Sequence, residues 1–185
     1  MKAQNRALEH NERVAGKALD ASIAASRNDQ RAFVFAIDPA SSSLGFEEGK
    51  RLRWDVQFIN YGKSPASHVR YDIHIFIGDD VPKRVDSFFA SSRIVPTALQ
   101  GGFLLPPNVG NGGRDTPSFR FHSAFSDGVL TAKDLMLIQA KDGAAAVAGR
   151  VWYDDVFEIS HYMDFCRATL ITGAVAECSR HNETH

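Results

Sequence analysis

The sequence has no long hydrophobic run, little net charge and only two cysteines. No window approaches the ~18–20 consecutive apolar residues that a membrane-spanning helix needs, and residues 1–16 lack the apolar core of a signal peptide. A formal net charge of −1 provides no general positive field that would concentrate nucleic acid. We therefore expect a soluble chain with no nucleic-acid partner, and membrane contact only if an anchor lies upstream.

Strong catalytic signatures are also absent. The chain contains no Gly-x-Ser-x-Gly, His-Glu-x-x-His or Walker sequence. The glycine-rich stretch from Leu104 to Pro117 lacks the Gly-Lys-Ser/Thr ending and the strand-to-helix context of a phosphate loop, so we interpret it as a surface loop. We expect no cofactor and favour a non-catalytic protein over an enzyme.

The N-terminal residues have the pattern of a helix. Residues 2–30 contain no proline and are rich in alanine, and Leu8, Ala15, Leu19 and Ile23 recur at helical spacing. The sequence predicts two parts, a helix or stalk at residues 1–28 and a domain at residues 29–185. Since a narrow, alanine-rich stripe suits helix pairing, we expect weak self-association through residues 5–27.

The remainder has the pattern of short strands. Residues 51–60 alternate between apolar and polar side chains, as do residues 69–77, which follow a polar turn. Further strands are predicted at 31–37, 118–125, 144–153 and 161–171, with one or two edge strands between Arg84 and Val95. His68 and His74 lie roughly 20 Å apart along their strand, so we expect two solvated surface histidines.

One short helix interrupts the strands. Thr131 precedes a helical run and Asp134 follows three residues later, which resembles a capping box. No repeated strand-helix-strand rhythm is present, so the pattern favours an antiparallel sheet over a doubly wound one. The predicted fold is mainly β: an antiparallel, immunoglobulin-like β-sandwich with an N-terminal α-helix and one short helix between late strands.

The C-terminal stretch gathers most of the residues that could carry chemistry. If the chain reverses around residue 172, Cys166 and Cys178 fall opposite each other on paired strands, where a disulfide fits. Two reduced, buried thiols and a metal site are the alternatives. The metal site would use His161, Cys166, Cys178 and His181, although His161 and Cys166 point to opposite faces of a strand.

Asp154 and Asp155 form an adjacent acidic pair. An acid/base pair needs two carboxyl groups that converge on one substrate, whereas neighbouring strand residues point apart. A role in a turn is therefore favoured, because Asp side chains bind nearby backbone there.

Three segments together resemble a known group of proteins. They are residues 29–34, residues 58–66 and the C-terminal run from Tyr153 through Phe157, His161, Cys166 and Cys178 to Asn182. The chain resembles a family of uncharacterised bacterial proteins in which a membrane helix and a helical stalk precede a β-sandwich of unknown function. The resemblance implies a cell-envelope location, where the two cysteines would be oxidised.

Two hypotheses of function follow. The first is a non-catalytic interaction or structural module of the bacterial cell envelope, which binds a protein partner through the loop from Leu104 to Pro117. The alternative is a metal-assisted hydrolase or metal-binding domain that uses His161, His181 and Asp154 or Asp155.

Overall fold

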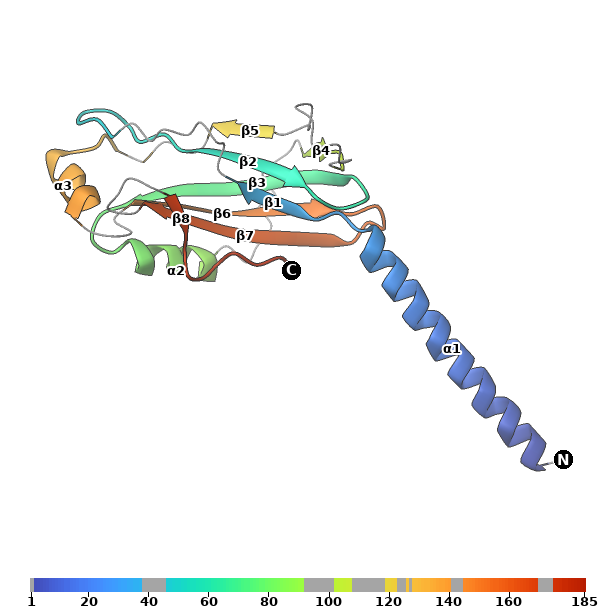
Figure 1. Ribbon diagram of the computed structural model, residues 1–185. Coiled ribbons are helices and arrows are strands. Elements are labelled where there is room, and N and C mark those ends of the chain that lie inside the picture. Colours follow the sequence, from blue (N-terminus) through green and yellow to red (C-terminus); the bar gives the residue numbers. More distant parts are fainter. Residues whose placement is uncertain are drawn as a thin grey trace.

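The described residues fold into two antiparallel sheets and three helices, seen in a computed structural model (Figure 1). The structure describes residues 2–37, 46–91, 102–107, 119–122, 126, 128–140, 145–169 and 175–185. Its elements are α1 (Lys2–Gln30), β1 (Val34–Ile37), β2 (Asp55–Asn60), β3 (Ala66–Ile77), α2 (Val81–Ser91), β4 (Phe103–Leu105), β5 (Phe119–His122), α3 (Ala132–Ala140), β6 (Ala145–Asp154), β7 (Ser160–Thr169) and β8 (Val175–Glu177). The prediction of a mainly β, antiparallel fold with an N-terminal helix is confirmed.

The strands divide into a small sheet and a larger one. The small sheet has the order β1-β2-β5, and the larger has the order β4-β3-β6-β7-β8. Every described pairing within them is antiparallel. Large side chains from both sheets, among them Phe58 from β2 and Phe165 from β7, meet in one core, with 5.9 Å between these two ring centroids. The two sheets are therefore layers packed face to face.

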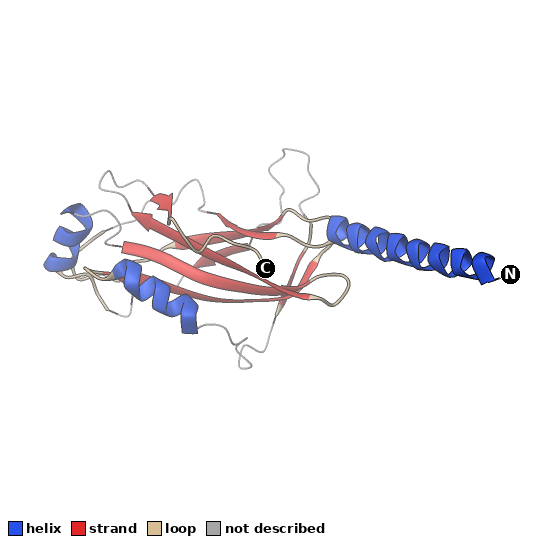
Figure 2. Cartoon of the chain, turned by 90° about the horizontal axis from the view of Figure 1, so that it is seen from below, coloured by secondary structure: helices blue, strands red, loops and turns tan. Residues whose placement is uncertain are grey.

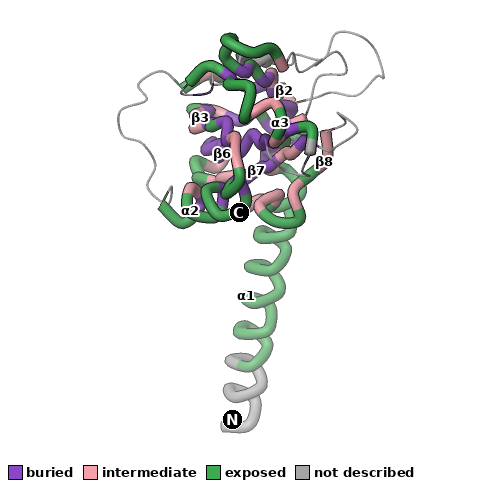
Figure 3. The backbone as a smooth tube through the Cα atoms, turned by 90° about the vertical axis from the view of Figure 1, so that its left-hand side faces the viewer, coloured by how far each residue is buried: buried purple, intermediate pink, exposed green. Residues whose placement is uncertain are grey.

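Helix α1, predicted at residues 1–28, ends two residues later at Gln30, and it projects away from the sheets (Figure 1, Figure 3). Residues 10–30 are all exposed. The last turn contacts the sandwich, where Lys63 Nζ lies 2.7 Å from the Asp29 carboxylate and the Arg27 guanidinium lies 5.7 Å from the Phe157 ring centroid. At 1.5 Å per residue the helix is roughly 40 Å long, and it forms an arm on a compact head.

Helix α2 corrects one prediction. Edge strands were expected between Arg84 and Val95, but the chain is helical through Ser91, and residues 92–95 lie outside the described residues. The helix forms because Val81, Val85 and Phe89 recur every four residues and bury one face, with Pro82 in the first turn. Figure 2 shows α2 lying along the face of the larger sheet.

The larger sheet is covered on both faces at β6. Residues 145–153 of this strand are all buried. The inward side chains, such as Val147 and Val151, join the core between the sheets, whereas Ala146 and Ala148 pack with Val85 beneath α2. A strand that is buried on both faces has a nearly continuous run of apolar residues in its sequence. Helix α2 forms a second layer on the outer face of the larger sheet, and a cleft lies beside the helix on this face.

Helix α3 begins as predicted. The hydroxyl and backbone N–H of Thr131 both donate to the Asp134 carboxylate, and the N–H of Asp134 donates to the Thr131 hydroxyl at 3.2 Å. These hydrogen bonds lower the pKa of Asp134. The capping-box interpretation is therefore confirmed with Asp in the place of the usual Glu. Among the described helices, none combines the length and the hydropathy that crossing a bilayer requires.

Candidate functional site

The two cysteines lie in the register that the sequence predicts. Strands β7 and β8 pair Arg167 with Glu177 and Thr169 with Val175, so their symmetry centre is residue 172. The next pair outward is Cys166 and Cys178, which form a disulfide with 5.3 Å between their Cα atoms. The predicted turn at residues 172–173 lies outside the described residues. The disulfide holds the C-terminal segment, residues 175–185, at the edge of the larger sheet.

The C-terminal segment continues along β7 after the disulfide. The N–H of His185 donates to the carbonyl of Tyr162 at 2.8 Å, and the N–H of Tyr162 donates back at 3.1 Å. Asp164 and Glu183 exchange a second pair of backbone hydrogen bonds. Residues 179–182 bulge out between these anchors. The last residues of the chain therefore act as an edge strand that carries a short raised loop.

The side chain of Asn182 fixes this loop. Its Oδ1 accepts hydrogen bonds from the backbone N–H of Cys166 and from the Arg167 guanidinium, at 3.1 Å and 2.8 Å. Its Nδ2 donates to the carbonyls of Cys178 and Arg180. One amide thus satisfies groups on both sides of the bulge, which gives the raised loop a defined shape.

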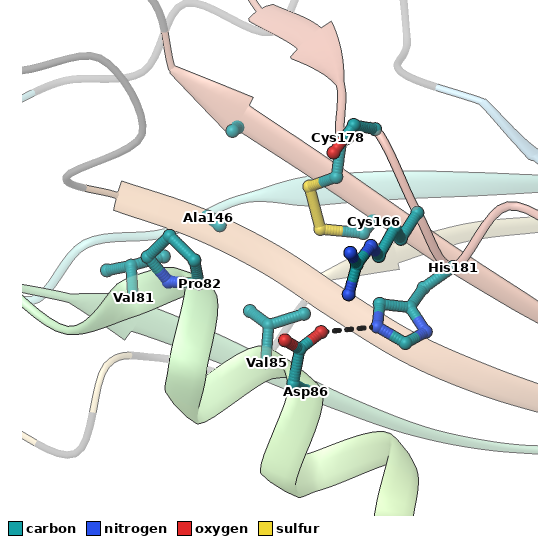
Figure 4. Close-up of a pocket in the computed structure, with 11 residues that line it drawn as sticks. Val81, Pro82, Val85, Asp86, Ala146, Cys166, Cys178 and His181 are labelled. Carbon is teal, nitrogen blue, oxygen red and sulfur yellow. Dashed lines mark hydrogen bonds and ion pairs between the residues drawn. A yellow bond between two sulfur atoms is a disulfide. The ribbon is translucent and has the colours of Figure 1, made fainter.

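A cleft lies between α2 and the C-terminal segment (Figure 4). The first cavity has a volume of about 450 Å³. Ala146, Ala168 and the disulfide form its floor, and residues 81, 82 and 85 of α2 form one wall. A second cavity of about 680 Å³ continues it over Trp152 and Tyr162. Both cavities are lined by Asp86, Arg180 and His181. The two cavities therefore adjoin each other in this cleft and share these three residues, the first lined mainly by apolar side chains and the second by more polar ones.

His181 links the raised loop to α2. Its Nε2 lies 2.7 Å from Oδ1 of Asp86, and its ring stacks on Phe89 with 4.2 Å between centroids. His181 adopts a left-handed backbone conformation, with φ of 63°. Such a conformation is uncommon for a residue with a side chain, and here it turns the imidazole toward the helix (Figure 4). The contact closes one side of the cleft.

A buried ion pair lines the second cavity. Arg150 Nε lies 2.5 Å from Asp164 Oδ1, and Nη2 lies 2.6 Å from Oδ2, a bidentate arrangement. The two side chains are only 6% and 8% exposed. The Arg150 guanidinium also lies 4.5 Å from the ring centroid of Tyr162. The hydrogen bonds that Arg150 donates to Asp164 raise the pKa of Arg150, so the pair is a fixed polar feature of this face.

The four residues of the proposed metal site are distributed differently. Cys166 and Cys178 are bonded to each other, His181 pairs with Asp86, and His161 pairs with Asp155 at the other end of β7. Within the described residues, no three His, Cys, Asp or Glu side chains gather as metal ligands would. The structure does not bring the four predicted residues together.

Asp155 lies in the turn between β6 and β7, as predicted, whereas Asp154 is the last residue of β6 and pairs with Ser160. Asp155 Oδ1 accepts hydrogen bonds from the backbone N–H groups of Phe157 and Ile159, at 2.9 Å and 3.1 Å. Its Oδ2 lies 2.8 Å from Nε2 of His161. Asp155 is buried, whereas Asp154 is half-buried. Asp155 therefore shapes the turn.

Asp154 connects two polar side chains. Its Oδ1 accepts a hydrogen bond from the Ser160 hydroxyl at 2.6 Å, and its Oδ2 lies 3.0 Å from Nδ1 of His68. A serine nucleophile would instead give its proton to a histidine. The His68 side chain is 72% exposed and that of His74, paired with Asp72, is 49% exposed. Both match the prediction of surface histidines.

Asp155 provides a pH-dependent contribution to stability. Burial raises its pKa, but the hydrogen bonds from His161, Ile159 and Phe157 outweigh burial, so the pKa falls below its ordinary value. Because this pKa is lowered in the folded state, the ionised Asp155 carboxylate stabilises the fold at pH values above the unfolded-state pKa of about 3.9. This contribution is lost as the pH falls through the folded-state pKa.

We expect Asp155→Asn to lower the free energy of unfolding by about 1–3 kcal/mol at neutral pH, because it removes hydrogen bonds to a charged group. Urea unfolding from pH 2 to pH 7 measures this difference. The loss should shrink below about pH 4, where the unfolded chain begins to bind a proton at this residue, and it should be smallest once the pH is below the folded-state pKa of Asp155. A difference between the two proteins that stays constant across the whole range would contradict the assignment.

The charged residues Asp86, Arg150, Asp164 and Arg180 of the cleft were missed in the sequence. The four-residue spacing of Val81, Val85 and Phe89 is the signal that would have placed Asp86 on a helix.

Comparisons with known proteins do not identify a site or a function, since no family model, curated protein or solved structure matches the chain.

Proposed function

We propose that the chain is a non-catalytic interaction module of the bacterial cell envelope, in which a β-sandwich head is carried on a helical arm. The observation that carries this proposal is α1, which is exposed throughout residues 10–30 and projects from the head (Figure 3). An isolated helix is marginal in water unless its apolar stripe is covered. An exposed helical arm of this kind is typical of a protein that binds other protein chains.

We also propose that the head belongs to the immunoglobulin-like architecture. In that fold, strands A, B and E share one sheet, and strands C′, C, F and G share the other. The order β1-β2-β5 corresponds to A-B-E, and the order β4-β3-β6-β7 corresponds to C′-C-F-G. Strand β8 extends the G edge. Loops at the ends of such a scaffold commonly carry recognition.

The arm is expected to pair with a second copy of itself. Val14, Leu19 and Ile23 are 51%, 61% and 43% exposed, although all three are large and apolar. Pairing would bury them at about 25 cal/mol per Å² of apolar surface. Sedimentation analysis should show weak, concentration-dependent dimers for the full chain and only monomers for residues 28–185.

Two single substitutions sharpen this test. Leu19→Ser should weaken the association because it removes part of the stripe, whereas Lys17→Ser changes a neighbouring exposed residue and should leave the dimer unchanged. Identical monomer masses for the full chain and for residues 28–185 would refute arm-mediated pairing.

The contact surface of the head stays a prediction. The predicted contact loop from Leu104 to Pro117 begins inside a strand, because Leu104 and Leu105 belong to β4 and Leu105 is buried, and its residues 108–117 lie outside the described residues. The cell-envelope location is carried by the family resemblance, and a disulfide suits an oxidising compartment.

Elemental analysis separates this proposal from the metal-assisted hydrolase. A folded sample purified without chelator should contain no stoichiometric metal if the protein is an interaction module. A stoichiometric transition metal in that sample would favour the hydrolase instead.

A further inference from the structure

The apolar end of the cleft is a cavity because small residues occupy the sheet beneath α2. Ala146 and Ala168 lie where larger side chains would fill the space, and Val81 and Val85 wall it from the helix. The Cys166–Cys178 disulfide completes the lining (Figure 4). Binding pockets for small molecules are typically apolar cavities of this size with a few placed polar groups.

The polar group that is available at this cavity is Arg180. Its side chain is exposed and lines both cavities. In the part of the chain that the structure describes, the Arg180 guanidinium makes no hydrogen bond, ion pair or ring contact. Asp86 is already held by His181, and Asp164 is held by Arg150. The cation of Arg180 is therefore free to receive an anion.

We propose that this cleft binds an unbranched aliphatic carboxylate, with its hydrocarbon chain in the apolar cavity and its carboxylate on Arg180. The guanidinium fork matches a carboxylate in a bidentate arrangement. A chain with no other polar group suits a floor made of alanine side chains and a disulfide. The inference rests on the proposed binding role of the head, but it does not depend on the arm.

The probe is octanoate, titrated calorimetrically into the full-length, oxidised protein. Saturable binding to one site is expected. Across a series from butanoate to octanoate, each added CH₂ should raise the affinity about fourfold, which corresponds to ~0.8 kcal/mol of transfer free energy. Octanol should bind at least about tenfold more weakly than octanoate, because it cannot pair with Arg180.

Two variants locate the site. Ala168→Leu should abolish binding by filling the cavity, and Arg180→Glu should lower the affinity at least about tenfold by placing a like charge at its mouth. Lys83→Glu makes the same charge change at an exposed residue of α2 outside the cavity lining, and should leave the affinity unchanged. Unfolding curves for each variant confirm that the fold is kept.

Three results would overturn the proposal. The first is that octanoate shows no saturable binding. The second is that Ala168→Leu leaves the affinity for octanoate unchanged, and the third is that octanoate and octanol bind with equal affinity. A failure here with arm-mediated dimers still observed would reject only this ligand. Octanoate binding without dimers would instead leave the ligand site standing and reject the arm.

Discussion

Asp164→Ala is expected to lower the free energy of unfolding by about 3–5 kcal/mol, the largest effect of any substitution considered for this protein. The change removes the carboxylate that both Nε and Nη2 of Arg150 contact, and it leaves the Arg150 charge inside a layer where the side chain is only 6% exposed. A buried charge that loses its counter-ion bears the full cost of desolvation. Urea unfolding at neutral pH measures the loss.

Two controls distinguish this effect from a loss of packing. The double variant Arg150→Met/Asp164→Ala removes both charges and should recover much of the stability, because apolar replacement of a buried pair is often close to neutral. Lys63→Ala breaks an exposed pair with Asp29 and should cost at most about 1 kcal/mol. A cost for Asp164→Ala no larger than that of Lys63→Ala would show that the pair is not buried.

Cys178→Ser is expected to cost about 2–4 kcal/mol. The bond closes a short loop, with a sequence separation of 12, and it anchors the segment that carries Arg180 and His181. Losing it removes the constraint on the unfolded chain and frees the raised loop from β7. Denaturant unfolding should show the loss, and reduction of the native protein with a dithiol should reproduce it.

Mass spectrometry tests the bond itself. After alkylation under denaturing, non-reducing conditions, the protein should carry no modified cysteine and should be lighter by the two hydrogens lost on oxidation. Two modified cysteines would rule the disulfide out. Ser179→Ala, a change at the neighbouring exposed residue, serves as the matched control and should be neutral.

Local patterns allowed several parts of this fold to be predicted. Helix α1 follows from the spacing of Leu8, Ala15 and Leu19, and the α3 start follows from Thr131 and Asp134, since each depends on residues within a few positions. The register of Cys166 against Cys178 was also accessible, because a single reversal point fixes every pair in a short hairpin.

The cleft could not be predicted in the same way. Its ion pairs join Arg150 to Asp164 and Asp86 to His181, residues that are 14 and 95 positions apart. Such contacts depend on which strands pair and on α2 packing over the sheet. The helix itself was missed because its short run of Val, Phe and Ser also suits an edge strand, and tertiary packing decided between them.

Whether the head is a binding module can be decided by measuring binding between purified components. A partner captured by the full chain from its own cells would be purified and titrated against residues 28–185 and against a variant in which the predicted loop is shortened only within residues 108–117, so that strand β4 is kept. We expect saturable binding to the head and a loss of that binding when the loop is shortened. Failure of the purified partner to bind residues 28–185 would contradict the claim.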